Sequence, residues 1–396
     1  MLSPESAGII RATLPVVGAS LDAITTRFYG TMFAERPELL DGMFNRGNQA
    51  NGEQRKALAG SIAAFAAALV EHPDERPDRL LARIAHKHTA VGVASEHYII
   101  VHKYLFGAIA EVLGEAVTPE VAAAWDEVYW LMAGALIALE AQIYAAAGAR
   151  DASTWRRWQV VERREETPDV ASFLLRPVGD DPVPPGRPGQ YVSVRTRMPD
   201  GVHQLRQYSL SGAGQDGLRR ITVKRVSGGG APDGEVSTLL HATVGAGDEL
   251  TLSAPFGDVC LEEGDAPLVL VSAGIGCTPM AAMLEHLAAT GSTRRVLLLH
   301  ADRARADHAL REDMERLADA LPGAERIFWY EEADGDARTG LMDLTGVAIP
   351  EGAVTYMCGP LPFMRDVRAQ LVAAGVAPRD IHYEVFGPDL WLGADD

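Results

Sequence analysis

Residues Ser272–Met280 read SAGIGCTPM and stand where an apolar run gives way to a helical pattern. The run Pro267–Ala273 predicts a buried strand, and the apolar spacing over Met280–Ala289 predicts a helix. Glycines let a backbone approach a pyrophosphate closely, and proline suits the first turn of a helix. Because Pro279 occupies the third glycine position, this is not the G-x-G-x-x-G fingerprint. The stretch predicts a strand, a phosphate-binding turn and a helix.

The same alternation continues towards the end of the chain. Further strands are predicted at Arg295–His300, Ile327–Tyr330, Val354–Met357 and Ile381–Val385, and further helices at Arg305–Leu321 and Phe363–Ala374. Alternation of this kind is typical of a parallel sheet with helices on both faces. We therefore expect an α/β domain over residues 265–396.

Short strand candidates separated by glycine, proline and aspartate fill the middle of the chain. They lie at residues 158–161, 172–175, 190–194, 206–210, 220–226 and 249–253. Residues 180–189 and 227–234 are rich in turn formers, which predicts surface loops. The pattern predicts an antiparallel β-barrel over residues 155–262.

The first part of the chain has a different rhythm. Its apolar residues recur at three- and four-residue spacing, as in Ala59–Val70 and Val121–Ala147. An all-α domain is therefore expected over residues 1–147, and the short polar stretch Gly148–Thr154 is interpreted as the linker to the barrel.

Composition excludes several classes of protein. The chain has 396 residues and a formal net charge of −18, which argues against nucleic acid as a partner. Its three cysteines form no close pair, which disfavours a zinc site or disulfide framework, and they are too few for a cysteine-ligated iron–sulfur cluster. We see no export signal and no long uncharged apolar run, so a cytoplasmic protein without a membrane span is expected.

The helical part carries residue types that a haem pocket needs. Haem requires an axial ligand, an aromatic or apolar clamp and polar groups for a bound diatomic ligand. His86 and His88 are two positions apart on a helix, so at most one of them can reach a haem. Glu140 lies in an apolar helix, where a carboxylate is either hydrogen-bonded or turned to solvent. The other candidates are Tyr29, Phe33, Phe44, Gln54, Leu58 and Tyr98.

Residues Leu2–Tyr144 resemble the globin domain of flavohaemoglobins. The most specific stretches are Arg27–Phe33, Met43–Gln49, Gly52–Leu58 and Lys87–Thr89. The resemblance implies that His88 is the proximal iron ligand, with Lys87 beside it. It further implies that Phe44 packs on the haem, Leu58 caps the distal side, Tyr29 and Gln54 are distal polar groups, and Tyr98 and Glu140 contact the proximal histidine.

The remainder resembles the ferredoxin–NADP reductase family. Arg206–Leu210, which reads RQYSL, is similar to the flavin-binding strand, in which arginine pairs with the FAD pyrophosphate, tyrosine flanks the isoalloxazine and serine bonds near its N5. Ser272–Met280 is similar to the nicotinamide-side motif, although Cys277 stands where flavohaemoglobins commonly have glutamine, so the choice between NADH and NADPH stays open. Cys358 fits either a place beside the nicotinamide or a small buried hydrophobe.

The residues expected to bind FAD or NAD(P)H share these motifs. By resemblance, Phe386 covers the flavin and Glu384 lies between flavin and haem. The full set is Tyr191, Arg206, Gln207, Tyr208, Ser209, Val236, Ser237, Thr238, Gly274, Ile275, Gly276, Cys277, Thr278, Pro279, Cys358, Gly359, Pro360, Glu384, Val385, Phe386, Gly387 and Pro388.

The two resemblances together imply a nitric oxide dioxygenase. It would carry haem b and FAD, use NADH or NADPH, and convert NO and O₂ to nitrate, with electrons passing from NAD(P)H to FAD to haem. The alternatives are an O₂ store or sensor kept ferrous by its own reductase, a general haem or flavin reductase, and a scaffold with degenerate sites. The expected partners are O₂, NO and NAD(P)H, and a monomer is expected.

Overall fold

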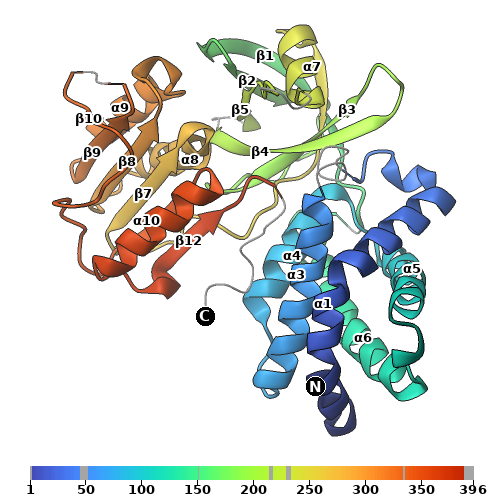
Figure 1. Ribbon diagram of the computed structural model, residues 1–396. Coiled ribbons are helices and arrows are strands. Elements are labelled where there is room, and N and C mark those ends of the chain that lie inside the picture. The colour runs from blue at the N-terminus through green and yellow to red at the C-terminus, as the bar shows by residue number, and fades with distance from the viewer. Residues whose placement is uncertain are drawn as a thin grey trace. The chain divides into compact units, whose positions relative to one another are not determined.

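A computed structural model describes residues 2–44, 52–149, 151–213, 217–228, 233–332 and 335–387. The chain forms two compact units. The first contains residues 1–154, 195–205 and 387–396, and the second contains residues 155–194 and 206–386. Three regions follow one another along the chain, as the sequence predicts: a helical region, an antiparallel barrel and a parallel sheet with helices (Figure 1).

The first unit is a bundle of helices around an apolar core. Its helices are α1 (Pro4–Glu35), α3 (Glu53–Glu71), α4 (Asp78–Val91), α5 (Ser95–Leu113) and α6 (Pro119–Ala146), with 3₁₀ turns η1 (Pro37–Leu40) and η2 (Gly114–Ala116). Ser3 and Thr118 cap α1 and α6 by accepting hydrogen bonds from the backbone N–H groups three residues on. Phe28, Met32 and Leu81 are fully buried between these helices.

Helices α1 and α6 are long and apolar enough to cross a membrane by length and composition alone. Charged residues interrupt both helices, for example Asp22 in α1 and Asp126 in α6, so neither contains a long uncharged apolar run, as the sequence predicts. Core helices of globular proteins pass the same test, and both helices contribute buried side chains to the helical core, such as Ile24 and Leu136. Their apolar character therefore does not indicate a membrane span.

A closed six-stranded antiparallel barrel follows in the chain, and most of its residues belong to the second unit. Its strands pair in the order β1-β2-β5-β4-β3-β6. Alternate side chains such as Phe173 and Leu175 point into a core from which water is excluded. The strands are β1 (Arg156–Thr167), β2 (Val170–Pro177), β3 (Tyr191–Arg197), β4 (His203–Ala213), β5 (Arg219–Lys224) and β6 (Glu249–Leu252), and α7 (Glu235–Thr243) lies between β5 and β6 in the chain.

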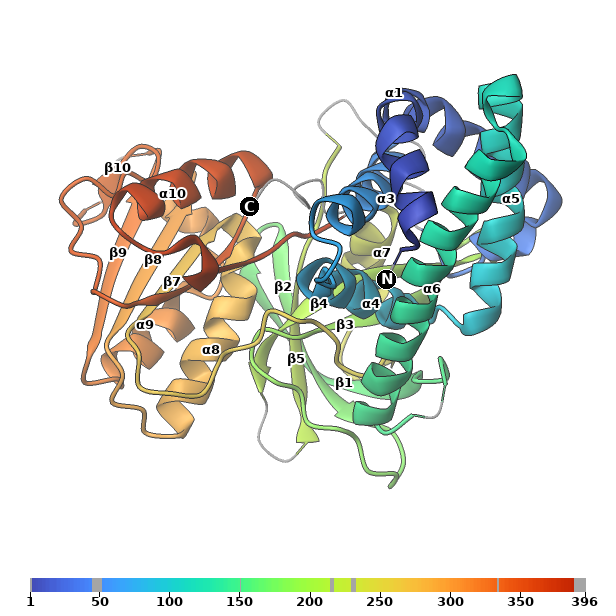
Figure 2. The same ribbon diagram turned by 90° about the horizontal axis from the view of Figure 1, so that it is seen from below.

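The same unit continues as a parallel sheet ordered β10-β9-β8-β7-β11-β12. Figure 2 shows α8 and α9 on one face and α10 on the other. The strand order reverses between β7 and β11, which is where α/β sheets bind ligands beyond their carboxyl ends. The elements are β7 (Leu268–Ala273), α8 (Cys277–Ala289), β8 (Val296–Asp302), α9 (Arg311–Asp319), β9 (Ala324–Tyr330), β10 (Arg338–Thr339), β11 (Val354–Cys358), α10 (Leu361–Ala373) and β12 (Ile381–Glu384).

One predicted helix starts later than the periodicity suggests. Instead of a helix from Arg305, a 3₁₀ turn covers Arg305–Asp307 and α9 begins at Arg311. Leu310 between them has a left-handed backbone, with φ of +59°, and its side chain is only 2% exposed. Burial of this leucine in the core explains a conformation that side chains otherwise avoid.

Candidate functional site

His88 lies near the end of α4 and is held by two residues from other helices. Its Nδ1 is 2.8 Å from Oε1 of Glu140 on α6 and 3.0 Å from the hydroxyl of Tyr98 on α5. The Tyr98 hydroxyl donates to the same Glu140 oxygen at 2.5 Å. Glu140 is 3% exposed, so it is a buried, hydrogen-bonded carboxylate and does not face solvent.

This arrangement defines which ring nitrogen of His88 is available. A carboxylate only accepts, so Nδ1 carries the proton and Nε2 keeps its lone pair. The His88 side chain remains 35% exposed although its Nδ1 edge is bonded. Burial and the Glu140 charge raise the pKa of Tyr98, so that hydroxyl stays protonated and donates. The donor set therefore fits a haem iron held through Nε2 of His88, with Glu140 orienting the ring.

Aromatic rings pack against the predicted distal tyrosine. Tyr29 stacks on Phe33 with ring centroids 5.5 Å apart and meets Phe44 edge-on at 6.1 Å. Burial raises the pKa of Tyr29, and a hydrogen bond with Gln54 opposes this only in part. Leu58 packs against the same core. The structure thus brings together a neutral phenol, an amide and apolar side chains, which could accommodate a haem and a polar diatomic ligand.

The predicted phosphate ligands of the flavin come together in the barrel. Arg206 on β4 interacts electrostatically with Glu235, the first residue of α7. Burial lowers the pKa of Arg206, which marks a cation that lacks full hydration. Val236, Ser237 and Thr238 follow Glu235 in the first turn, where backbone N–H groups favour anions. An arginine beside a helix start is a suitable cradle for a pyrophosphate.

Strand β4 also presents the predicted ring contacts. Burial raises the pKa of Tyr208, so its hydroxyl is neutral. Ser209 is 5% exposed, and among the described residues its hydroxyl has no hydrogen-bond partner. Such a buried hydroxyl is unfavourable unless a ligand satisfies it, which fits the polar edge of a flavin. Tyr191 is buried where β3 meets Phe256, and Gln207 is partly exposed.

The two predicted nicotinamide segments lie side by side. β7 and β11 pair in parallel with Ser272 opposite Cys358, so the turns that follow these strands are neighbours. A Cβ on Gly276 would lie 2.2 Å from the Cys358 carbonyl oxygen, so no other residue fits there. The two turns are therefore neighbours. The first turn and helix start contain Gly274, Ile275, Thr278 and Pro279, and the second turn contains Gly359 and Pro360.

Both cysteines of these segments are fully buried. The Cys277 thiol donates to the Ala309 carbonyl at 3.5 Å, and burial raises its pKa well above the ordinary value. It is therefore a neutral packing residue and no nucleophile. Cys358 lies on β11 opposite Glu384, the last residue of β12.

The closing segment is only partly described. Glu384 is buried, Val385 follows it, and the Phe386 ring is 48% exposed, which leaves it available for stacking. Gly387 has φ of +136°, and Pro388 lies outside the described residues. Lys87 precedes His88 on α4 and is partly exposed.

Two polar clusters were not predicted, a buried pair of histidines and a partly exposed group of charged residues around Asp313. His300 and His308 stack with ring centroids 3.7 Å apart, and their Nδ1 atoms bond Ser272 and Tyr330. Asp313 on α9 joins two arginines of the barrel. No local pattern reveals either cluster, because their members are distant in sequence.

Comparisons with known proteins match all three parts of the chain. Residues 26–136 match the globin family, residues 157–260 the oxidoreductase FAD-binding domain, and residues 270–369 the oxidoreductase NAD-binding domain. The fold and these matches define a globin joined to a flavin- and nicotinamide-dependent reductase.

Full-length relatives identify the family. The chain is 43% identical to the flavohemoprotein of Bordetella pertussis, over 98% of this chain and 99% of that one, and 36% identical to that of Bacillus subtilis, over 99% of each. It superposes on the crystal structure of a Malassezia yamatoensis flavohemoglobin with bound FAD and heme at a TM-score of 0.91, with 41% identity over 98% of this chain and all of the other. The chain belongs to the flavohaemoprotein family.

A fourth relative covers only the reductase. The FAD/NAD-binding domain of a nitric oxide dioxygenase from Vibrio cholerae is 38% identical, with a TM-score of 0.56 over 59% of this chain and 99% of the other. The protein is therefore an oxidoreductase whose cofactors are haem, FAD and NAD(P)H, as the sequence predicts.

Proposed function

We propose that the protein is a nitric oxide dioxygenase. In the proposed reaction two NO, two O₂ and one NAD(P)H give two nitrates, one NAD(P)⁺ and one proton. The domain boundaries inferred from sequence, 1–147, 155–262 and 265–396, and the roles given to the individual site residues are part of this proposal. The observation that carries it is the buried contact of Glu140 with His88 Nδ1 at 2.8 Å.

The proximal residues act by fixing a proton. Glu140 accepts from Nδ1 of His88, which orients the ring and makes Nε2 a stronger electron donor. Tyr98 donates to the same carboxylate and keeps it in place. A strongly donating axial ligand favours activation of oxygen over its reversible storage.

The distal residues act by placing a neutral donor. Tyr29 stays protonated because it is buried, and Phe33 and Phe44 hold its ring. Its hydroxyl could donate a hydrogen bond to a polar diatomic ligand. When bound, FAD, haem and the nicotinamide would supply the redox chemistry, and the residues of this chain would hold and orient them.

The reductase residues would bind and orient FAD and the nicotinamide. Arg206 and the first turn of α7 would hold the FAD pyrophosphate, and Tyr208 and Ser209 would contact the ring. The close approach of Gly276 to Cys358 brings together the two segments that would hold the nicotinamide. The name of the Vibrio relative adds support to this assignment of the reductase.

A rapid-mixing experiment distinguishes a nitric oxide dioxygenase from an oxygen store. NADH-reduced, O₂-saturated protein is mixed with one equivalent of NO, and nitrate and the visible spectrum are followed. A dioxygenase forms nitrate within the mixing experiment and is reduced again by NADH. Slow displacement of O₂ by NO without nitrate would support the store or sensor.

A further inference from the structure

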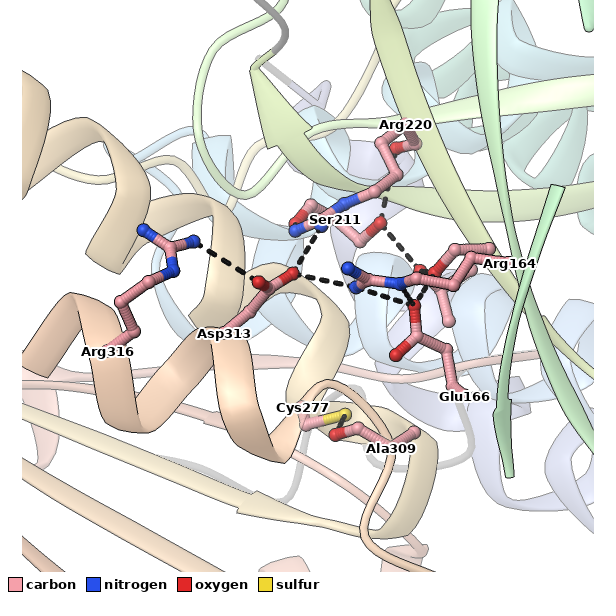
Figure 3. A network of polar contacts seen from close by, with 10 residues as sticks. Arg164, Glu166, Ser211, Arg220, Cys277, Ala309, Asp313 and Arg316 are labelled. Carbon is pink, nitrogen blue, oxygen red and sulfur yellow. Dashed lines mark hydrogen bonds and ion pairs between the residues drawn. The ribbon is translucent and has the colours of Figure 1, made fainter. Parts of the chain in front are cut away.

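Asp313 on α9 joins the nicotinamide-binding sheet to the flavin barrel within the second unit. Its Oδ2 accepts hydrogen bonds from Arg220 on β5 at 2.5 Å and from Arg164 on β1 at 2.8 Å (Figure 3). Arg316, one turn further along α9, reaches Oδ1 at 3.1 Å. One carboxylate therefore ties two barrel strands to a helix of the sheet.

The carboxylate at the centre of this ion cluster is largely shielded from solvent, whereas Arg164 and Arg316 at its edge are 45% and 67% exposed. The Asp313 side chain is 13% exposed and that of Arg220 17%. The arginines hold the pKa of Asp313 well below its usual range, so the charge is permanent under physiological conditions. The ion pairs of a shielded carboxylate with two guanidinium groups are stronger than an exposed pair such as that of Asp319 and Arg326, whose side chains are 64% and 37% exposed.

On the barrel side, the cluster is anchored to the flavin strand. Arg220 Nη2 donates to the carbonyl of Ser211 at 2.7 Å, and Ser211 lies on β4 two residues beyond Ser209. A Cβ on Gly212, the next residue, would lie 2.4 Å from the Glu285 carboxylate of α8. β4 and α8 thus approach closely here, and a side chain at Gly212 would require the ends of Glu285 and Arg220 to move.

On the sheet side, the cluster is anchored to the nicotinamide motif. α9 begins directly after Ala309 and Leu310, both 2% exposed. The Ala309 carbonyl accepts from the thiol of Cys277, the first residue of α8 after the glycine turn. Figure 3 shows this contact beside the ion cluster. A short, buried path therefore connects Asp313 to the residues that would hold the nicotinamide.

We propose that Asp313 is a positioning residue, which sets the nicotinamide motif at the correct distance from the flavin strand for hydride transfer. This inference rests on the proposed route from NAD(P)H to FAD. Hydride transfer requires reacting atoms at near contact, and a misplacement of about 1 Å lowers the rate by up to about a hundredfold. Asp313 touches neither cofactor motif itself, so its effect falls on geometry and not on affinity.

The test is stopped-flow reduction of FAD by NADH in the full-length protein. Asp313→Asn should lower the limiting rate at saturating NADH about tenfold or more, while the apparent Kd for NADH changes less than about twofold. Asp313→Glu should restore part of the rate. Asp319→Asn is the matched control and should transfer hydride at the parental rate.

Hydrogen exchange of the same variants supplies a readout that does not depend on turnover. Asp313→Asn should increase amide exchange in α9 and at the start of α8, and Asp319→Asn should leave the start of α8 unchanged. Equal exchange in the parent and Asp313→Asn would overturn the proposal even if the parent failed to reduce its flavin. That failure would instead count against the proposed function.

Two further results would contradict a positioning role. One is a parental limiting rate in Asp313→Asn, and the other is a loss confined to NADH affinity. If Asp313→Asn cannot be produced with FAD bound, the same measurements are made on Arg164→Gln. This variant should fold, because Arg164 is 45% exposed and Arg220 still pairs with Asp313. A parental limiting rate and parental exchange in Arg164→Gln would equally overturn the proposal.

Discussion

Each unit of the molecule contains a shielded carboxylate where side chains from separate elements meet, and the two are stabilised in opposite ways. Glu140 accepts from a phenol and an imidazole, both neutral donors. Asp313 accepts from two guanidinium groups, which compensate its charge. The first arrangement leaves negative charge to act on His88, whereas the second neutralises it locally. The same group thus tunes a ligand in one unit and fixes geometry in the other.

The largest expected effect concerns the histidine that Glu140 supports. His88→Ala removes the imidazole whose Nδ1 is held by Glu140 and whose Nε2 would bind the iron. Stable haem binding should therefore be lost completely. The absorption spectrum should lack a Soret band while the flavin bands persist. His86→Ala is the control on the same helix, and a normal Soret band in His88→Ala would transfer the ligand role to another residue.

Glu140→Gln should have the next largest effect. The amide keeps the size of the side chain but removes its charge, so His88 becomes a weaker donor. Loss of such a supporting group typically costs about ten- to a hundredfold in activity. We expect NO consumption to fall by that factor with haem content retained, and the iron–histidine stretching frequency to decrease. An unchanged frequency would show that the charge does not reach the ligand.

Asp313→Asn should destabilise the reductase unit in a pH-dependent manner. Because folding lowers the pKa of Asp313, the ion pairs contribute stability above the unfolded value of about 4, and this is lost as pH falls towards the folded pKa. The variant should lose about 1–3 kcal/mol at pH 7. Thermal unfolding from pH 7 to pH 3 should show the gap to the parent narrowing below about pH 4, and a gap that widens there would contradict the assignment.

Tyr98→Phe should have the smallest effect of the series. It removes one of the two donors to Glu140, at a cost of roughly 1.5–3 kcal/mol for a hydrogen bond to a charged group, part of which His88 recovers by holding the carboxylate alone. Haem should remain bound, and NO consumption should fall less than in Glu140→Gln. A larger fall than in Glu140→Gln would mean that Tyr98, and not the carboxylate, controls His88.

Glu140 could be predicted from the sequence as a site residue, whereas Asp313 could not. Glu140 stands out because a carboxylate inside an apolar helix needs a partner, and the glycine turn at Gly274–Gly276 is a local pattern. Asp313 lies in a helix rich in charged residues, and its partners Arg164 and Arg220 are 149 and 93 positions away. The break at Leu310 likewise depends on burial in a tertiary core, which periodicity cannot show.

The most direct test of the proposed function is the amount of nitrate formed per NADH consumed by the full-length protein under O₂ with limiting NO. One hydride carries two electrons and each NO requires one, so the account predicts two nitrates per NADH and no nitrate without O₂. NADH oxidation without nitrate would identify a general reductase, and reversible O₂ binding without nitrate would identify a store or sensor. Either result would contradict a nitric oxide dioxygenase.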